Sequence, residues 1–268
     1  MQKLQNIKAL ILDMDGVLWR GNEPVGDLPT IFNAIVASGL KVTLATNNST
    51  RTAEQHLVKI TGFGVDLSVK QVLSSAMATA AKLKEDFPEG GDLYVVGHEG
   101  ITKAAEEEGF RVFQEDEIPE NPVAVVSGID WEITYKKIAN AAMLIRNGAP
   151  FYGTNPDKTY PTPTGFMPGA GTILAAIETA SGVAPIVAGK PKPYLFRLAM
   201  QRMGVSPDET LVVGDRLETD ILGGQNAGCF TAQVLSGVST REQGEAWGPK
   251  PTIVAENLTE VIKSLEKN

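Results

Sequence analysis

The segment "IKALILDMDGVLW", residues 7–19, decides the fold class of this sequence. Residues 7–12 form a short apolar run of the kind that fills a strand buried on both faces of a sheet. Two carboxylates, Asp13 and Asp15, follow this run directly. Like charges beside a buried strand repel each other and lose hydration, so something positive must lie between them. The segment therefore predicts a buried strand that ends at a charged site.

Further short apolar runs alternate with helical patterns along the chain. Runs typical of strands lie at residues 41–46, 93–97, 123–128, 185–189, 210–215 and 229–235. Helical patterns lie between them, at residues 28–39, 51–62, 99–108, 133–146, 170–181 and 195–204. This alternation, with continuous Val, Ile and Leu in the strands, predicts an α/β fold with a parallel sheet covered by helices on both faces.

Two breaks in composition divide the chain. The Pro/Gly-rich segment 147–171 is the longest stretch expected to be irregular, and "DFPEGGD" at 86–92 is the second break. A long irregular loop in a compact domain usually marks a functional loop or a boundary. We therefore predict that residues 77–185 form a separate α/β unit, inserted between a first core part, 1–76, and a second, 186–268.

The overall charge and the cysteine content restrict the class of partner and the compartment. The chain has 24 Lys and Arg against 32 Asp and Glu, a formal net charge of −8, which argues against nucleic acid or an anionic membrane as a partner. Its single cysteine, Cys229, excludes an internal disulfide framework and fits a reducing compartment. We find neither a signal-peptide pattern nor the roughly 18 apolar residues needed to span a membrane. These features predict a soluble, cytoplasmic protein.

Polar residues follow four of the predicted core strands, and they are Asp13 and Asp15, then Thr46, Asn47 and Asn48, then Lys190, and finally Asp215 and Asp220. The carboxyl ends of parallel strands meet at one edge of a sheet, where ligands bind in open α/β folds, so these residues can converge on one crevice. Clustered carboxylates without His or Cys favour Mg²⁺. An ammonium group, a hydroxyl and the N–H groups of a helix start favour a phosphoryl group. Together they predict phosphoryl transfer.

The same segments resemble the motifs of a known family. "DMDGVLW", "LATNNST", "GKPKP" and "GDRLETD" are similar to motifs one to four of the haloacid dehalogenase-like (HAD) superfamily, in the family's order. The inserted unit falls between motifs two and three, as in members with a type II cap. Residues 154–182 resemble the cap-to-core segment of the nitrophenylphosphatase/NagD-like branch, whose caps are of type IIA. The resemblance implies a Rossmann-like HAD core with an inserted α/β cap domain.

This resemblance implies a role for each motif residue. Asp13 would attack the phosphoryl group and form an aspartyl-phosphate, and Asp15 would protonate the leaving oxygen and then activate water. The superfamily's dehalogenases lack an aspartate at the position of Asp15, so its presence favours phosphate chemistry. Thr46 and Lys190 would hold phosphoryl oxygens, and Asn47 and Asn48 belong to the same phosphate-binding motif.

The resemblance also implies the metal ligands. Mg²⁺ would be bound by the Asp13 carboxylate, the Asp15 main-chain carbonyl and Asp215. Asp220 would act through a bound water, or by contacting these ligands rather than the metal itself.

Simpler explanations remain open for some of these residues. Residues 46–48 also suit a helix-capping turn, and the helix dipole alone favours an acidic residue such as Asp220 near a helix start. Lysines such as Lys190 usually lie on the surface. Asn155 and Asp157 could contact the leaving group of a substrate, but Asn-Pro-Asp is also a normal turn sequence.

We therefore predict a Mg²⁺-dependent phosphatase that acts on small-molecule phosphate monoesters. Two alternatives stay open: a phosphoryl-transfer mutase of the same fold, and a phospho-accepting regulatory module resembling bacterial receiver domains. Receiver domains are about half this length and lack both the inserted cap and the acid two residues after the nucleophile. Family members often self-associate through the cap, which favours a homodimer. The residues do not identify the substrate, because the shape of the cap loops decides it.

Overall fold

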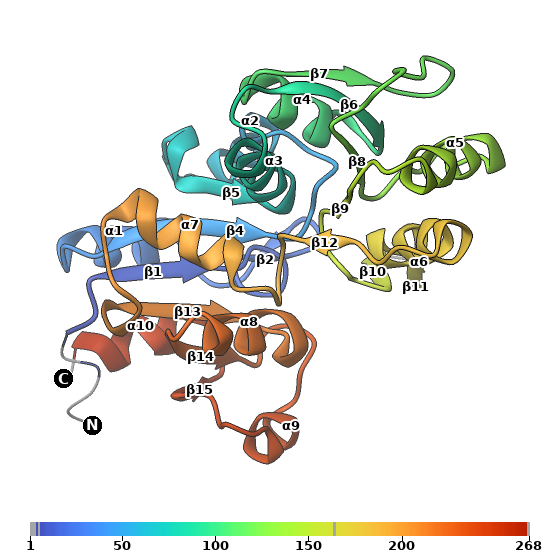
Figure 1. Cartoon of the computed structure of the whole chain (residues 1–268). Coiled ribbons are helices and arrows are strands. Elements are labelled where there is room, and N and C mark those ends of the chain that lie inside the picture. Colours follow the sequence, from blue (N-terminus) through green and yellow to red (C-terminus); the bar gives the residue numbers. More distant parts are fainter. Residues whose placement is uncertain (1–3, 5, 163–164, 267–268) are drawn as a thin grey trace. The chain divides into compact units, whose positions relative to one another are not determined.

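The structure is a computed structural model that describes residues 4, 6–162 and 165–266. The chain divides into two compact units (Figure 1). The described residues up to Thr46, together with Glu54–Leu73 and those from Lys190 onward, form the first unit. Residues 47–53 and Ser74–Gly189 form the second unit. Each unit has its own sheet, so the predicted α/β class is confirmed.

The first unit is built on a six-stranded sheet with the order β15-β14-β13-β1-β4-β5. The strands are β1 (Ala9–Leu12), β4 (Lys41–Thr46), β5 (Val72–Ser74), β13 (Thr210–Gly214), β14 (Phe230–Val234) and β15 (Ile253–Ala255). The pairings from β15 to β4 are all parallel. Every residue of β1 and β13 is buried, because both faces of the central strands are covered.

Helices cover this sheet, and they are α1 (Leu28–Ala37), α2 (Ala53–Gly62), α7 (Tyr194–Met203), α8 (Leu222–Asn226), α9 (Arg241–Ala246) and α10 (Leu258–Glu266). Two short 3₁₀ turns lie at Val69–Gln71 and Pro207–Glu209, and a π-helical turn lies at Leu217–Ile221. Helix α7 packs over β1 and β4, and α1 packs against α10. Helix α1 begins where the Asp27 side chain accepts the Thr30 N–H at 3.2 Å. Its buried stripe is Leu28, Ile31, Phe32 and Ile35, the spacing of one helix face.

The second unit has a five-stranded parallel sheet with the order β12-β9-β8-β6-β7. Its strands are β6 (Gly91–Val96), β7 (Phe110–Phe113), β8 (Ala124–Ser127), β9 (Phe151–Gly153) and β12 (Ile186–Val187). Its helices are α3 (Ser75–Asp86), α4 (Glu99–Glu107), α5 (Tyr135–Arg146) and α6 (Ala170–Ser181).

Alternate residues of β6 enter two different cores of this unit. Leu93 and Val95 pack with residues of α3 and α4, whereas Tyr94 and Val96 pack with residues of α5 and α6. Because successive side chains of a strand point to opposite faces, each helix pair covers one face of the sheet. Figure 1 shows the two pairs flanking the strands. The second unit is therefore a complete three-layer α/β/α fold.

Two small hairpins complete the described residues. In the first unit, β2 (Trp19–Arg20) pairs antiparallel with β3 (Glu23–Pro24) directly after the first motif. In the second unit, β10 (Thr159–Thr162) pairs antiparallel with β11 (Gly165–Pro168).

The structure corrects two expectations about the segments around the insertion. The segment 147–171 was expected to be irregular, yet it contains β9 and the β10–β11 hairpin; residues 163–164 lie outside the described residues. Proline and glycine are tolerated there because both strands of a two-stranded ribbon are edge strands. The expected core strand at 185–189 is wrong: Ile186 pairs with Tyr152 of β9, in the sheet of the second unit. A strand of two residues carries no sequence signal for the sheet it joins.

Candidate active site

The candidate site lies at the carboxyl ends of β1 and β13 in the first unit. The two strands are parallel neighbours in register, with Leu12 opposite Val213. The Asp13 N–H donates to the Val213 carbonyl at 2.9 Å, so Asp13 continues the backbone pairing of β1 with β13. Asp215 is the first residue after β13. The two carboxylates are thus brought together by strand pairing, as the sequence predicts.

Lys190 supplies the positive charge that the buried carboxylates require. Its Nζ donates to Asp13 Oδ1 at 2.5 Å and to Asp220 Oδ1 at 2.6 Å. A third bond runs to the Ala45 carbonyl of β4 at 3.2 Å. The Lys190 side chain is only 4% exposed, so it is not a surface lysine. Three bonds to two strand ends and a turn fix this ammonium group against Asp13.

Asp220 reaches the site from the π-helical turn that follows β13. The Ile221 N–H donates to the Arg216 carbonyl, the i to i+5 bond of such a turn, at 3.2 Å. The Arg216 N–H donates to Asp220 Oδ2 at 3.1 Å, which leaves Oδ1 for Lys190. A helix-dipole preference alone would leave Asp220 on the surface, but it is 1% exposed. Its placement supports a role in the site.

The environment shifts the pKa values of these groups. Burial raises the pKa of Asp13 well above its usual range, against the opposing effect of Lys190. Burial and the neighbouring Asp220 raise the pKa of Asp215 to about 6. Burial alone would lower the pKa of Lys190, but Asp13 and Asp220 raise it above its ordinary value. Carboxylates packed this closely favour any further cation among them.

The backbone closes tightly around Asp215. The Val238 N–H donates to Asp215 Oδ2 at 2.8 Å. A Cβ at Gly237 would lie 1.9 Å from that oxygen, and a Cβ at Gly16, where φ is +86°, would lie 2.5 Å from it. Both positions therefore need glycine. The other oxygen, Asp215 Oδ1, is buried and has no hydrogen-bond partner.

These residues fit a divalent metal ion. Asp13, Asp215 and Asp220 each offer an oxygen, all within 4.8 Å of one another, and no other cluster of three such groups occurs in the described part of the chain. Three carboxylates face one ammonium group, so negative charge remains to be balanced. The buried Asp215 Oδ1, which has no hydrogen-bond partner, is an oxygen that could bind a metal ion. An all-oxygen donor set without His or Cys suits Mg²⁺.

Asp15 follows Asp13 by two residues and differs from the buried carboxylates. Its side chain is exposed, and its Oδ1 accepts the indole N–H of Trp19 at 2.7 Å. Sequence reasoning missed this partner. The turn that follows Gly16 brings residues four apart together, but no role for Trp19 was predicted from the sequence.

Residues of the second motif lie in both units. Thr46 ends β4 in the first unit and is 4% exposed. Asn47 and Asn48 belong to the second unit, where Asn48 Oδ1 accepts the N–H of Thr50 at 3.0 Å and its hydroxyl at 2.7 Å. Asn48 thus closes an Asx turn on Thr50, ahead of α2, which begins at Ala53. The role of these three residues in phosphate binding stays a prediction.

Asn155 and Asp157 contact Asn47 within the second unit. Asn155 Nδ2 donates to the Asn47 carbonyl at 2.7 Å, and Asn47 Nδ2 donates to Asp157 Oδ2 at 3.0 Å. The Ser75 hydroxyl donates to the same carbonyl at 2.7 Å. Asn155, which is 2% exposed, therefore ties the segment 47–53 to its unit. A role of Asn155 and Asp157 in substrate specificity stays a prediction.

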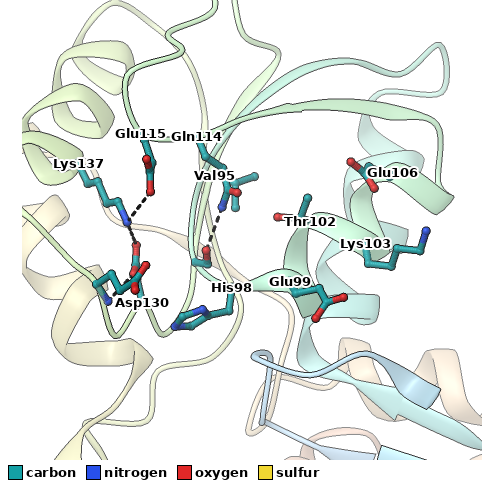
Figure 2. A pocket seen from close by; sticks show the side chains of 12 residues that line it. Val95, His98, Glu99, Thr102, Lys103, Glu106, Gln114, Glu115, Asp130 and Lys137 are labelled. Carbon is teal, nitrogen blue, oxygen red and sulfur yellow. Dashed lines mark hydrogen bonds and ion pairs between the residues drawn. The ribbon is translucent and has the colours of Figure 1, made fainter. Parts of the chain in front are cut away.

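The second unit also contains a polar pocket that the sequence did not predict, with a volume of about 410 Å³ (Figure 2). It lies beyond the carboxyl ends of the adjacent strands β6 and β8, the position where open α/β sheets bind ligands. Lys137 Nζ lies 3.0 Å from Asp130 Oδ2 and 3.7 Å from Glu115 Oε1. His98 lines the pocket and its Nε2 accepts the Trp131 N–H at 3.0 Å. Common residue types spread over forty positions gave no motif to detect.

Comparisons with known proteins agree with the four motifs. A family model described as haloacid dehalogenase-like hydrolase matches residues 10–111, and a HAD-hydrolase-like model matches residues 187–261. An acid sugar phosphatase of Staphylococcus saprophyticus is 34% identical over 98% of this chain and 100% of its own length.

Two solved structures are also similar over nearly the whole chain. A 4-nitrophenylphosphatase from Thermotoga maritima has a TM-score of 0.90 and 33% identity, and the match covers 98% of this chain and 99% of that one. A glycerol phosphate phosphatase from Mycobacterium tuberculosis, solved in complex with magnesium, has a TM-score of 0.87 and 32% identity, over 97% of this chain and 77% of that one. The resemblance to the nitrophenylphosphatase-like branch is confirmed, and the chain belongs to the haloacid dehalogenase-like hydrolase family.

Proposed function

We propose that this protein is a magnesium-dependent phosphatase that hydrolyses small-molecule phosphate monoesters through an aspartyl-phosphate on Asp13. The observation that carries the proposal is the cluster of Asp13, Asp215 and Asp220 within 4.8 Å, with Lys190 held on Asp13. The names of similar proteins support the same activity, since they are phosphatases of sugar phosphate, 4-nitrophenyl phosphate and glycerol phosphate esters.

In the first half-reaction, a carboxylate oxygen of Asp13 forms a bond to phosphorus while the bond from phosphorus to the leaving oxygen breaks. Asp15, which is exposed, gives its proton to that oxygen. Lys190 neutralises charge on Asp13 and on the phosphoryl oxygens, and Thr46 is proposed to hold the latter.

In the second half-reaction, water attacks the phosphorus of the aspartyl-phosphate and the bond to Asp13 breaks. Asp15, now a carboxylate, takes the proton of that water, so the side chain returns to its first state. Mg²⁺, held by Asp13, Asp215 and the Asp15 carbonyl with Asp220 behind them, would neutralise the phosphoryl charge and orient the ester. After one complete turnover, each residue is back in the protonation state with which it began.

We also infer that the second unit, whose main segment Ser74–Gly189 includes the predicted insertion 77–185, is the cap domain that selects the substrate. Under this inference, differences in its loops set the preference among esters. In the described part of the chain, no helix has the length and apolar character to cross a membrane. A small-molecule phosphate ester is the substrate class proposed.

The test is phosphate release from 4-nitrophenyl phosphate, glycerol phosphate and a panel of sugar phosphates, with magnesium and with EDTA. We expect turnover only with magnesium, and a loss of about 10³-fold or more for Asp13→Asn. The matched control is Asp208→Asn, an exposed carboxylate of the same unit, which should retain full activity. Turnover unchanged in Asp13→Asn would refute the nucleophile. An isomerised sugar phosphate would indicate a mutase, and a phospho-aspartate that persists without turnover would indicate a regulatory module.

A further inference from the structure

The contact between Asp15 and Trp19 is unlike the other contacts of the site. Asp15 is exposed, so a free carboxyl there could rotate among several rotamers and could carry a proton on either oxygen. Trp19, in contrast, is 2% exposed, and its Nε1 donates to Asp15 Oδ1 at 2.7 Å. A buried ring therefore holds one oxygen of an exposed carboxyl group.

We propose that Trp19 is a positioning residue that fixes which oxygen of Asp15 delivers and accepts the proton during phosphate-ester hydrolysis. This inference rests on the proposed function. An indole N–H can only donate, so the oxygen that it contacts must offer a lone pair in both protonation states of Asp15. The carbonyl oxygen of a carboxylic acid accepts a hydrogen bond better than its hydroxyl oxygen does, so this contact favours the proton on Oδ2, the oxygen that Trp19 does not contact.

The surroundings of Trp19 make this donor rigid. The Gly16 N–H donates to the Trp19 carbonyl at 2.7 Å, and Trp19 pairs with Pro24 across the β2–β3 hairpin. The indole ring lies 5.9 Å from the Phe63 ring, centroid to centroid, and Lys59 Nζ lies 4.4 Å from its centroid. Backbone pairing, ring packing and a cation on the ring each restrict the side chain. The indole is thus in place before a substrate arrives.

The hairpin is also joined to the loop that holds Asp215. The Arg20 guanidinium donates to the Ser236 carbonyl, and the Ser236 hydroxyl donates to the Gly16 carbonyl at 2.7 Å. Val238, two residues later, bonds Asp215. The hairpin that carries the indole is therefore hydrogen-bonded to the same backbone segment that positions Asp215.

The inference has a consequence that depends on the leaving group. When the phosphorus–oxygen bond to an alkyl alcohol breaks, the leaving oxygen needs the Oδ2 proton, which moves to it in the same step. A 4-nitrophenolate leaves readily without that proton. Loss of the indole N–H should therefore slow alkyl esters and largely spare the aryl ester, whereas a general loss of structure should slow both.

The experiment compares kcat/KM for glycerol phosphate and 4-nitrophenyl phosphate in Trp19→Phe. We expect a loss of about 10- to 100-fold for the alkyl ester and of less than about 3-fold for the aryl ester. The matched control is Trp247→Phe, which removes another indole N–H of the same unit, donated to Gln225 at 3.3 Å. It should leave the ratio of the two substrates unchanged.

A second replacement keeps the inference testable if Trp19→Phe folds poorly. Benzothienylalanine at position 19 keeps the bicyclic ring and replaces only its N–H by sulfur, and it should change the ratio as Trp19→Phe does. In the Asp15→Asn background, Trp19→Phe should cost no further activity toward the alkyl ester, because the two residues act as one unit.

Equal losses on both substrates, or losses that add in the double variant, would overturn the inference. Asp15→Asn could lose more activity toward the alkyl ester than toward the aryl ester while neither replacement of Trp19 does so. The inference then fails while the proposed function stands. If Asp15→Asn itself shows no dependence on the leaving group, the acid role in the proposed function fails and the inference fails with it.

Discussion

The ammonium group of Lys190 lies 2.5 Å from Oδ1 of Asp13, although 177 positions separate the two residues in the sequence. Both side chains are largely buried, with 4% and 12% of their surface exposed. Removing one partner of a buried pair leaves the other charge without compensation, which costs far more than an exposed pair is worth. The stability of the metal-free site should therefore depend strongly on Lys190.

We expect Lys190→Met to lower the free energy of unfolding by about 3–5 kcal/mol at neutral pH in EDTA, because two buried carboxylates lose their cation. Urea unfolding followed by circular dichroism measures it. The matched control is Lys70→Met, an exposed lysine of the same unit, which should change the free energy by less than about 0.5 kcal/mol. Equal stability of Lys190→Met and the wild type would show that the pair does not form.

The metal-free protein should lose stability as the pH rises through the titration of Asp215. Its pKa is about 6 in the folded protein against an ordinary value of 3.8, so below pH 6 the folded state binds more protons than the unfolded state. By linkage, the free energy of unfolding then falls as the pH rises, by about 3 kcal/mol between about pH 4 and pH 7.

Urea titrations at several pH values, with EDTA, measure this dependence in the wild type and in Asp215→Asn. The variant should lack this part of the fall, because an amide does not titrate. Parallel curves for the two proteins would contradict the assignment. Saturating magnesium should reduce the fall in the wild type, since the cation favours the ionised carboxylate.

Gly237→Ala should damage the carboxylate cluster by sterics alone. Its added Cβ would lie 1.9 Å from Asp215 Oδ2, so the loop must move. We expect about 1–3 kcal/mol of destabilisation and a magnesium requirement at least about tenfold higher. Magnesium titration of activity, together with urea unfolding, measures both.

Gly62→Ala is the control for this substitution, because nothing lies within 4 Å of a Cβ at that position near the end of α2. It should be neutral or slightly stabilising. A Gly237→Ala protein with the wild-type magnesium requirement would show that this loop does not shape the site.

Most of the site was predictable because its residues follow strands. Asp13 and Asp215 each come directly after a buried apolar run, and parallel pairing alone brings such residues together. Lys190 was expected near Asp13 because it follows a predicted core strand, and it does lie beside Asp13, but that strand belongs to the other sheet. Its placement beside Asp13 depends on the chain returning to the first unit at that residue, which the motif indicates and the strand pattern does not.

The features that the sequence did not reveal depend on the geometry of short turns or on contacts between distant parts of the chain. The bond from Trp19 to Asp15 depends on the turn and hairpin geometry after Gly16. The burial of Asp220 depends on a π-helical turn, whose extra residue per turn has no residue signature. The pocket at His98 is formed where β6 and β8 end together, and only the strand order of the finished sheet reveals that they are neighbours.

Asn155→Ala should destabilise the second unit by about 1–3 kcal/mol, because the partly buried Asn47 carbonyl loses one of its donors. The matched control, Asn147→Ala, alters an exposed residue at the end of α5 and should have little effect. A specificity role makes a different prediction: the ratio of kcat/KM values among phosphate esters would change. An unchanged ratio in Asn155→Ala would limit this residue to holding the segment 47–53.

The central claim is that Asp13 becomes phosphorylated during turnover, and chemical trapping tests it most directly. The Asp15→Asn protein, mixed with 4-nitrophenyl phosphate and magnesium, should accumulate the aspartyl-phosphate, because the ester leaves readily while hydrolysis lacks its base. Acid quenching, borohydride reduction and peptide mass spectrometry should then find homoserine at position 13, absent when Asp13 is also replaced by Asn. Labelling of a different residue, or hydrolysis with no trapped acyl-phosphate, would contradict the account.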